Sequence, residues 1–194
     1  HSDLRHEDKH FQELINVFRT KRISEIPDEI IQSWGTRPAF IDFSLLYTVE
    51  LKVESIKGIL EKAPEYGAKL IPILNLSDSE EIKKVIRQTL KKHDNGICLR
   101  IVSSDLENTS NLNDELGAIL QYLDTSCGNV DLLVDLKENG AHYHRCFNLS
   151  QGIKDLAKWR NFIFACGTFP ENLSECTVDE PKPIPRIEWT SWLG

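Results

Sequence analysis

The chain has 194 residues, a formal net charge of −7 and a pI of about 5.4, and 40% of its residues are hydrophobic. This composition is typical of a globular protein with a sizeable core, and the acidic balance argues against broad, sequence-independent binding to nucleic acid, although a local basic groove stays compatible with it. No apolar run approaches the ~20 residues of a membrane span, and the N-terminal residues lack the apolar core of a signal peptide, so we expect no membrane partner.

Short apolar runs that end on polar or charged residues alternate with amphipathic helical stretches along the chain. In chain order, the sequence predicts a helix over 7–22, a short helix over 27–31, a strand over 38–44, a helix over 51–63, a strand over 69–75, a helix over 77–93, a strand over 97–102, a helix over 111–123, a strand over 130–136, a polar loop over 139–148, a helix over 153–159, a strand over 161–167 and a strand over 184–192. Ser77 and Glu80 have the spacing of a capping box, and Asn111 to Asn113 are candidate caps for the helix that follows them.

The alternation of strands and helices predicts βα units and a parallel sheet, in one α/β domain over residues 1–194. The strands read as continuous apolar runs, which is typical of a sheet covered by helices. Two architectures stay open: a partial TIM-barrel-like (β/α) repeat, or an open doubly wound parallel sheet. Because an intact barrel typically takes ~250 residues, we expect the 194 residues to be a fragment of a longer barrel that lacks the first and last strands.

The cysteines and the absent motifs narrow the class of protein further. Five cysteines are spread along the chain without a C-x-x-C pair, which predicts reduced thiols in a cytoplasmic protein. Methionine is absent, even at position 1, which also favours a chain that is part of a longer protein. The chain has no G-x-G-x-x-G, P-loop, G-x-S-x-G or H-E-x-x-H motif, so no nucleotide cofactor is expected.

Several segments carry a resemblance to a known family. They are Trp34-Gly35-x-Arg37-Pro38-x-Phe40-Ile41-Asp42-x-Ser44-Leu45-Leu46, Gly96-Ile97-Cys98-Leu99-Arg100-Ile101, Val130-Asp131-Leu132-Leu133-Val134-Asp135-Leu136, Trp159-Arg160 with Gly167-Thr168-Phe169-Pro170-Glu171-Asn172-Leu173, and Pro185-Arg186-Ile187-Glu188-Trp189. In order and spacing these segments resemble the phage-type beta protein family, a poorly characterised set of bacterial and phage proteins. The resemblance implies a roughly barrel-like architecture, members that are longer at both ends, and a setting near mobile elements and phage-defence genes.

Polar side chains that end the apolar runs are the first candidates for a functional site. Asp42, Asn75, Arg100, Asp135 and Glu188 each end or nearly end a run. Because chemistry in α/β folds sits where parallel strands end, we expect these side chains to gather at one mouth of the sheet. Arg100 would pair with Asp135 or Asp42, since its planar guanidinium matches a carboxylate.

The segments near the last two predicted strands add further candidates. Thr168, Glu171 and Asn172 follow the strand over 161–167 and are expected to form a loop that faces a substrate or a structural turn. Arg186 stands two residues before Glu188 on the last predicted strand. We assign Arg186 and these loop residues, with Asn75 and Arg100, to ligand binding.

Three interpretations of the strand-end residues stay open. Asp42, Asp135 and Glu188 could act as catalytic acid and base groups while Arg100 holds an anionic group such as a phosphate. Carboxylates could instead hold Mg²⁺ or Mn²⁺, because oxygen ligands suit hard cations. The third interpretation is a set of salt bridges that only orders the end of the sheet.

Two smaller patterns have a functional and a structural interpretation each. His142, His144 and Cys146 have a spacing that could offer zinc ligands, or they belong to a solvated loop. Trp189 and Trp192 lie three apart, and one of them would face a partner.

The function expected from these features is that of an accessory or effector component of a bacterial anti-phage or mobile-element system, which acts through a protein partner or a ligand at a barrel mouth. The alternative is a metal-dependent phosphodiesterase or hydrolase of TIM-barrel type. The expected partners are another protein or a second copy of the chain, and a ligand that contains phosphate.

Overall fold

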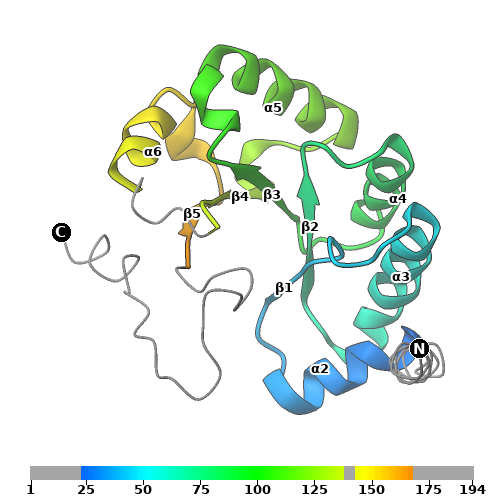
Figure 1. The fold of residues 1–194 in the computed structure, drawn as a ribbon. Coiled ribbons are helices and arrows are strands. Elements are labelled where there is room, and N and C mark those ends of the chain that lie inside the picture. The colour runs from blue at the N-terminus through cyan, green and yellow to red at the C-terminus, as the bar shows by residue number, and fades with distance from the viewer. Residues whose placement is uncertain (1–22, 138–142, 168–194) are drawn as a thin grey trace, which may run out of the picture. The chain divides into compact units, whose positions relative to one another are not determined.

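The computed structural model describes residues 23–137 and 143–167. The chain divides at residue 70 into two compact units. Figure 1 shows their helices and strands, and each unit is described here by itself.

From residue 23 onward, the first unit holds two α-helices and one strand. Its elements are η1 (Ile23–Glu25), α2 (Ile26–Trp34), β1 (Ala39–Ile41), α3 (Val49–Lys62) and η2 (Ala63–Tyr66). Helix α2 ends at Gly35, whose positive φ of 75° lets its amide donate to the carbonyl of Ile31 at 2.9 Å. Helix α3 begins after Thr48, whose hydroxyl accepts the amide of Leu51 at 3.1 Å. The amide of Ala39 donates to the carbonyl of Lys69 at 3.0 Å, so β1 begins beside the residues that lead into the next strand.

The second unit continues the alternation of strand and helix. Its elements are β2 (Leu70–Asn75), which begins at the boundary, α4 (Glu80–Leu90), β3 (Ile97–Val102), η3 (Asp105–Asn108), α5 (Thr109–Leu123), η4 (Cys127–Asn129), β4 (Val130–Asp135), α6 (Tyr143–Ser150), η6 (Leu156–Lys158) and β5 (Asn161–Ala165). Strands β2 to β5 pair in parallel, with Asn75 opposite Arg100 and Val102 opposite Asp135.

The order of the strands decides between the two predicted architectures. The sheet has the order β1-β2-β3-β4-β5, which is the order of the sequence. A doubly wound sheet instead reverses direction at a switch point, whereas successive (β/α) units of a barrel keep the chain order. The fold is therefore mixed α/β of the partial, barrel-like (β/α) type, and the doubly wound alternative is wrong.

The two faces of the second unit's sheet differ in burial. Leu74, Leu99 and Leu132 occupy one face and are fully buried, and Figure 1 shows α4, α5 and α6 along one side of these strands. On the other face, Arg100 and its register partner Leu133 are only partly buried. The polar residues at the strand ends discussed below belong to this second face, because side chains two apart on a strand share a face.

The structure corrects several predicted element boundaries. Helix α4 begins at Glu80 after the N-cap Ser79, and not with Ser77, because residues 75–78 form a turn in which the Asp78 amide donates to the carbonyl of Asn75. The cap of α5 is Asn108, whose side chain accepts the amide of Asn111 at 3.2 Å, so the prediction of Asn111 to Asn113 is wrong.

Helix α6 lies where a polar loop over 139–148 was predicted, and the predicted helix over 153–159 is only the short η6. The predicted helix over 7–22 and strand over 184–192 lie outside the described residues. Among residues 23–137 and 143–167, no helix combines the length and the apolar character needed to cross a membrane.

Candidate functional site

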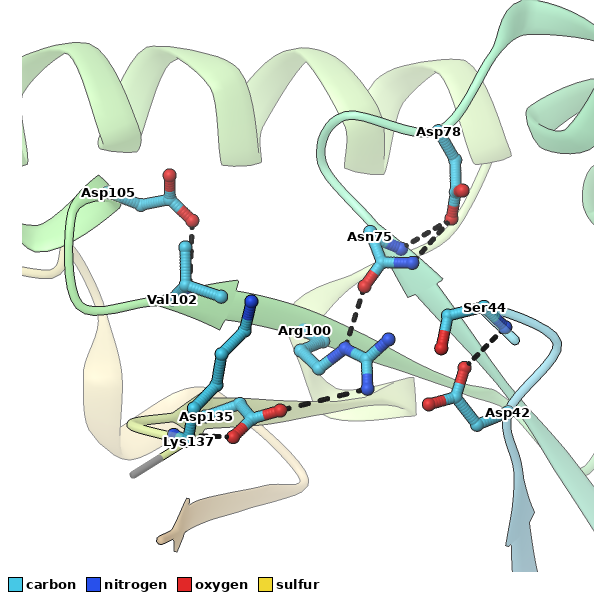
Figure 2. Close-up of polar contacts among 9 residues, drawn as sticks. All are labelled: Asp42, Ser44, Asn75, Asp78, Arg100, Val102, Asp105, Asp135 and Lys137. Atoms are coloured by element: carbon cyan, nitrogen blue, oxygen red, sulfur yellow. Dashed lines mark hydrogen bonds and ion pairs between the residues drawn. The ribbon is translucent and has the colours of Figure 1, made fainter. Parts of the chain in front are cut away.

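Asn75 at the carboxyl end of β2 meets Arg100 of the neighbouring strand β3. They are register partners at the end of β2 and in the middle of β3, so their side chains stand on the same face of the sheet. The Nε of Arg100 donates to Oδ1 of Asn75 at 2.7 Å (Figure 2). This contact fixes the plane of the guanidinium, whose side chain is only 15% exposed.

Asp135 approaches the same guanidinium from β4. Its Oδ2 lies 3.7 Å from Nη1 of Arg100, which is an ion pair too long to count as a hydrogen bond. Its Oδ1 accepts the amide of Lys137 at 2.9 Å, and Lys137 has a left-handed φ of 51°. The carboxylate therefore accepts a hydrogen bond from the turn after β4 and forms an ion pair with Arg100 (Figure 2).

Two aspartates hold the loops that follow β2 and β3 through the same kind of hydrogen bond. Oδ2 of Asp78 accepts the amide of Asn75 at 2.8 Å and its side-chain amide at 3.0 Å. Oδ2 of Asp105 accepts the amide of Val102 at 2.8 Å. In both cases the last residue of a strand donates to an aspartate three residues later, so β2 and β3 end in similar turns (Figure 2).

We refer to Asn75, Arg100 and Asp135 as the carboxyl-end cluster. Its parts are an oriented guanidinium, an amide and a carboxylate at hydrogen-bonding or near hydrogen-bonding distance. A guanidinium in this state recognises carboxylate or phosphate oxygens. Within the part of the chain that the structure describes, no group of three or more His, Cys, Asp or Glu side chains is arranged to hold a metal ion.

The other predicted site residues belong to the first unit or lie outside the described residues. Asp42 belongs to the first unit, where its Oδ1 accepts the amide of Ser44 at 2.8 Å (Figure 2). The remaining candidates fall outside the described residues; they are Thr168, Glu171, Asn172, Arg186 and Glu188. The structure therefore brings together three of the predicted residues, and the roles of all of them stay predictions.

The histidine and cysteine pattern lies partly on α6. His144 is exposed and Cys146 is buried, and side chains two apart on a helix do not face each other. Burial raises the pKa of the Cys146 thiol, which disfavours the thiolate that binds metals. His142 lies outside the described residues. The described part of this pattern does not form a pair of ligands.

A second polar cluster, which the sequence analysis missed, lies at the opposite end of the same face. Asp131 is 1% exposed and accepts two hydrogen bonds from Arg160, from Nε at 2.8 Å and from Nη2 at 2.7 Å. Asn161 also donates to this carboxylate at 2.7 Å, and Nη1 of Arg160 donates to the carbonyl of Asn95 at 2.8 Å. We call these four residues the amino-end clasp.

The clasp has the properties of a structural element. The hydrogen bond to Asp131 raises the pKa of Arg160, so the guanidinium stays charged. Gly96, with a φ of 71°, passes so close that a Cβ there would collide with Arg160 and with the carbonyl of Asn129. The sequence offered one sign of this cluster, which is that Asp131 and Arg160 both stand at the start of consecutive predicted strands.

Comparison with known proteins identifies the family. The model of the family described as "Beta protein" matches residues 10–193, which is nearly the whole chain. The chain belongs to the beta protein family. The resemblance noted in the sequence is thereby confirmed for this beta protein. Searches of curated proteins and of solved structures returned no match to it.

Proposed function

We propose that this beta protein binds a small ligand through a phosphate or carboxylate group at the carboxyl-end cluster. The observation that supports the proposal is an oriented, largely buried guanidinium among the polar side chains at the end of the strands. The Arg100 side chain is 15% exposed, its Nε donates to Asn75 at 2.7 Å, and its Nη1 lies 3.7 Å from Oδ2 of Asp135. A guanidinium held in this way is a charged, planar donor that matches the oxygens of a phosphate or carboxylate.

The position of the cluster supports the same proposal. Arg100, Asn75 and Asp135 occupy the carboxyl half of parallel strands, the end at which (β/α) proteins bind their ligands. The opposite end of the same face is occupied by the amino-end clasp, whose bidentate pair leaves the Asp131 carboxylate 1% exposed. Recognition at one end and structural support at the other is the division of roles that this fold class favours.

Titration of the protein with inorganic phosphate and with pyrophosphate, followed by calorimetry, tests the proposal. We expect binding to the unmodified protein, and a loss of about 10- to 100-fold in affinity for Arg100→Gln, because one charge-assisted contact contributes about 1.5–3 kcal/mol. Arg145→Gln is the matched control, since Arg145 carries the same charge on exposed α6, where it pairs with Glu107 at 2.6 Å. Absence of binding to the unmodified protein, or equal affinity of Arg100→Gln and the control, would refute the proposal.

The biological setting that we propose is the one implied by the family: a cytoplasmic accessory or effector component of a bacterial anti-phage or mobile-element system, which acts through a ligand or partner at this cluster. The test is phage infection of cells that carry the full reading frame. We expect Arg100→Gln to abolish the protein's effect on plaque formation and Arg145→Gln to retain it. An effect that survives Arg100→Gln would separate the biological role from the cluster.

The alternative proposal is a metal-dependent phosphodiesterase or hydrolase that uses Asp42, Asp135 and Glu188. The variants Asp135→Asn and Glu188→Gln in the full-length protein distinguish the two functions. An enzyme loses its biological effect with both changes, so an effect that persists with both changes would refute the hydrolase.

A further inference from the structure

The turn that leads into β3 contains two neighbouring residues that can react with each other. Asn95 is followed by Gly96, and because Gly96 has no side chain, its backbone nitrogen can approach the side-chain amide of Asn95. Asn95 is half-buried and is therefore in partial contact with water. The sequence has a second Asn–Gly pair, Asn139–Gly140, which lies outside the described residues. The pair in the turn is a candidate for spontaneous deamidation.

The deamidation reaction needs only water as a co-reactant. The nitrogen of Gly96 attacks Cγ of Asn95, and the new bond replaces the bond from Cγ to Nδ2. The Gly96 amide proton leaves with Nδ2, which departs as ammonia, and a five-membered succinimide ring remains. Water then adds its hydroxyl to one of the two imide carbonyls and its proton to the nitrogen. The product is either aspartate or isoaspartate at position 95.

The amino-end clasp holds the peptide bond between these two residues. The carbonyl of Asn95 accepts Nη1 of Arg160 at 2.8 Å. The same guanidinium donates two hydrogen bonds to Asp131, which is 1% exposed, so a buried partner fixes its position. On the other side of the peptide bond, Gly96 packs so closely that a Cβ there would collide with Arg160 and with the carbonyl of Asn129. The peptide is therefore held both at its oxygen and at Gly96.

Closure of the succinimide ring requires a backbone rotation that the clasp opposes. In the ring, the Gly96 nitrogen eclipses Cβ of Asn95 about the bond from Cα to the carbonyl carbon. Asn95 is not among the described residues with a positive φ, and the allowed α and β regions place that nitrogen away from the eclipsed position. Rotation into the reactive geometry turns the Asn95 carbonyl and thereby breaks its hydrogen bond to Arg160.

We propose that Asn95 is a deamidation site that the amino-end clasp keeps unreactive, so that modification takes place in molecules whose clasp has opened. Isoaspartate at position 95 then prevents the clasp from forming again. Its main chain is longer by one carbon atom, and the carbonyl that Arg160 binds becomes a carboxylate that competes with Asp131 for the guanidinium. The modification does not depend on the function proposed for the carboxyl-end cluster.

Peptide mapping by mass spectrometry, after incubation of the folded protein at mildly alkaline pH, measures the rate at Asn95 separately from that at Asn139. A synthetic peptide of residues 91–100 gives the rate without the fold. We expect Asn95 to react about tenfold or more slowly in the protein than in the peptide, which corresponds to a local opening that costs about 1.4 kcal/mol or more. Equal rates in the protein and the peptide would overturn the proposal.

Two variants of Arg160 test whether the clasp is the cause. Arg160→Ala removes the hydrogen bond to the Asn95 carbonyl and is expected to raise the rate at Asn95 about tenfold or more. Arg145→Ala, on exposed α6, is the matched control and should leave this rate unchanged. Arg160→Lys keeps a cation beside Asp131 but lacks the planar guanidinium that binds Asp131 and Asn95 together, so it should also raise the rate. An unchanged rate in Arg160→Lys would overturn the proposal even where Arg160→Ala fails to fold.

A loss of global stability would also expose Asn95, so a second control is needed. Leu116→Ala removes a side chain of α5 that is 3% exposed, and it destabilises the protein for a reason unrelated to the clasp. For the same fraction of unfolded protein, measured by urea unfolding, we expect Asn95 to react more slowly in Leu116→Ala than in Arg160→Ala. Equal rates would attribute the reaction to global unfolding and overturn the proposal.

The effect of isoaspartate on the clasp is measured in an Asn139→Gln background, in which Asn95–Gly96 is the one Asn–Gly pair left. Aged protein that carries isoaspartate at position 95 should unfold at a lower urea concentration than fresh protein. An unchanged midpoint would refute the loss of the clasp.

Discussion

Removal of the Arg160 side chain is predicted to be strongly destabilising. In the native structure Asp131 is 1% exposed. Arg160→Ala removes the two hydrogen bonds that Arg160 donates to the Asp131 carboxylate and leaves the one that the side-chain amide of Asn161 donates. Breaking a buried ion pair from one side typically costs about 3–5 kcal/mol. Because the Arg160 side chain is 28% exposed, we expect a loss at the lower end of this range, about 3 kcal/mol.

Urea unfolding followed by circular dichroism measures this loss. With a slope of about 2 kcal/mol/M, a cost of about 3 kcal/mol moves the midpoint down by about 1.5 M urea. Arg145→Ala is the matched control, since Arg145 and Glu107 are 63% and 51% exposed, and it should cost less than about 1 kcal/mol.

A double variant separates the cost of losing the Arg160–Asp131 ion pair from the cost of leaving the Asp131 carboxylate buried and unpaired. Asp131→Leu combined with Arg160→Met removes both charges and is expected to cost less than Arg160→Ala alone, because no carboxylate is left unpaired. A midpoint for Arg160→Ala that equals that of Arg145→Ala would refute the assignment of the clasp as the main electrostatic support of this end of the sheet.

Further predictions concern single residues of the described chain. Gly96→Ala is expected to destabilise the protein by about 1–3 kcal/mol, because the φ of 71° at Gly96 and the collision with the clasp both disfavour a Cβ. Gly117→Ala, on α5 with open space around it, should instead be neutral or stabilising by up to about 1 kcal/mol. A thermal unfolding midpoint that is higher for Gly96→Ala than for Gly117→Ala would contradict this reasoning. Asn108→Ala removes the cap of α5 and should cost about 1 kcal/mol in the same assay, with no change counting against the cap. The buried thiols of Cys98 and Cys146 should react with a thiol reagent only as fast as the protein unfolds, which mass spectrometry of labelled peptides will show, and rapid labelling of either in the native protein would contradict their burial.

The strands of the second unit between residues 70 and 136 were predicted well because their signal is local and strong, whereas the predicted strand over 38–44 is only the three residues of β1. The apolar run at 97–102 became β3 with the same bounds, and the run at 130–136 differs from β4 by one residue. Helix α6 was missed because its polar residues do not show a clear apolar period, so only tertiary packing of residues such as Cys146 selects the helix. The cap of α5 was misplaced because several residues near Asn108 can serve as caps, and the sequence does not show where the backbone turns.

The candidate site was accessible to the sequence for a similar reason. Asn75, Arg100 and Asp135 each stand near the end of an apolar run, and parallel strands bring such ends to one edge of a sheet. The pair of Asp131 and Arg160 was not found, because only the residues that end the runs were considered, and a charge at the start of a strand has no assigned partner until the register is known. The sequence therefore predicted which residues stand at the strand ends, but not which side chains pair across strands.

The amino-end clasp has a consequence for how this sheet opens. A single guanidinium joins the start of β5 to the carboxylate on β4 and to the carbonyl of Asn95, which lies in the turn that leads into β3. When the Arg160 contacts break, β3, β4 and β5 lose a connection that they share, so the backbone amides of these three strands should exchange with solvent as one cooperative unit. The turns at the far edge are each held by their own aspartate, so they can fluctuate or accumulate substitutions one at a time while the three strands stay closed.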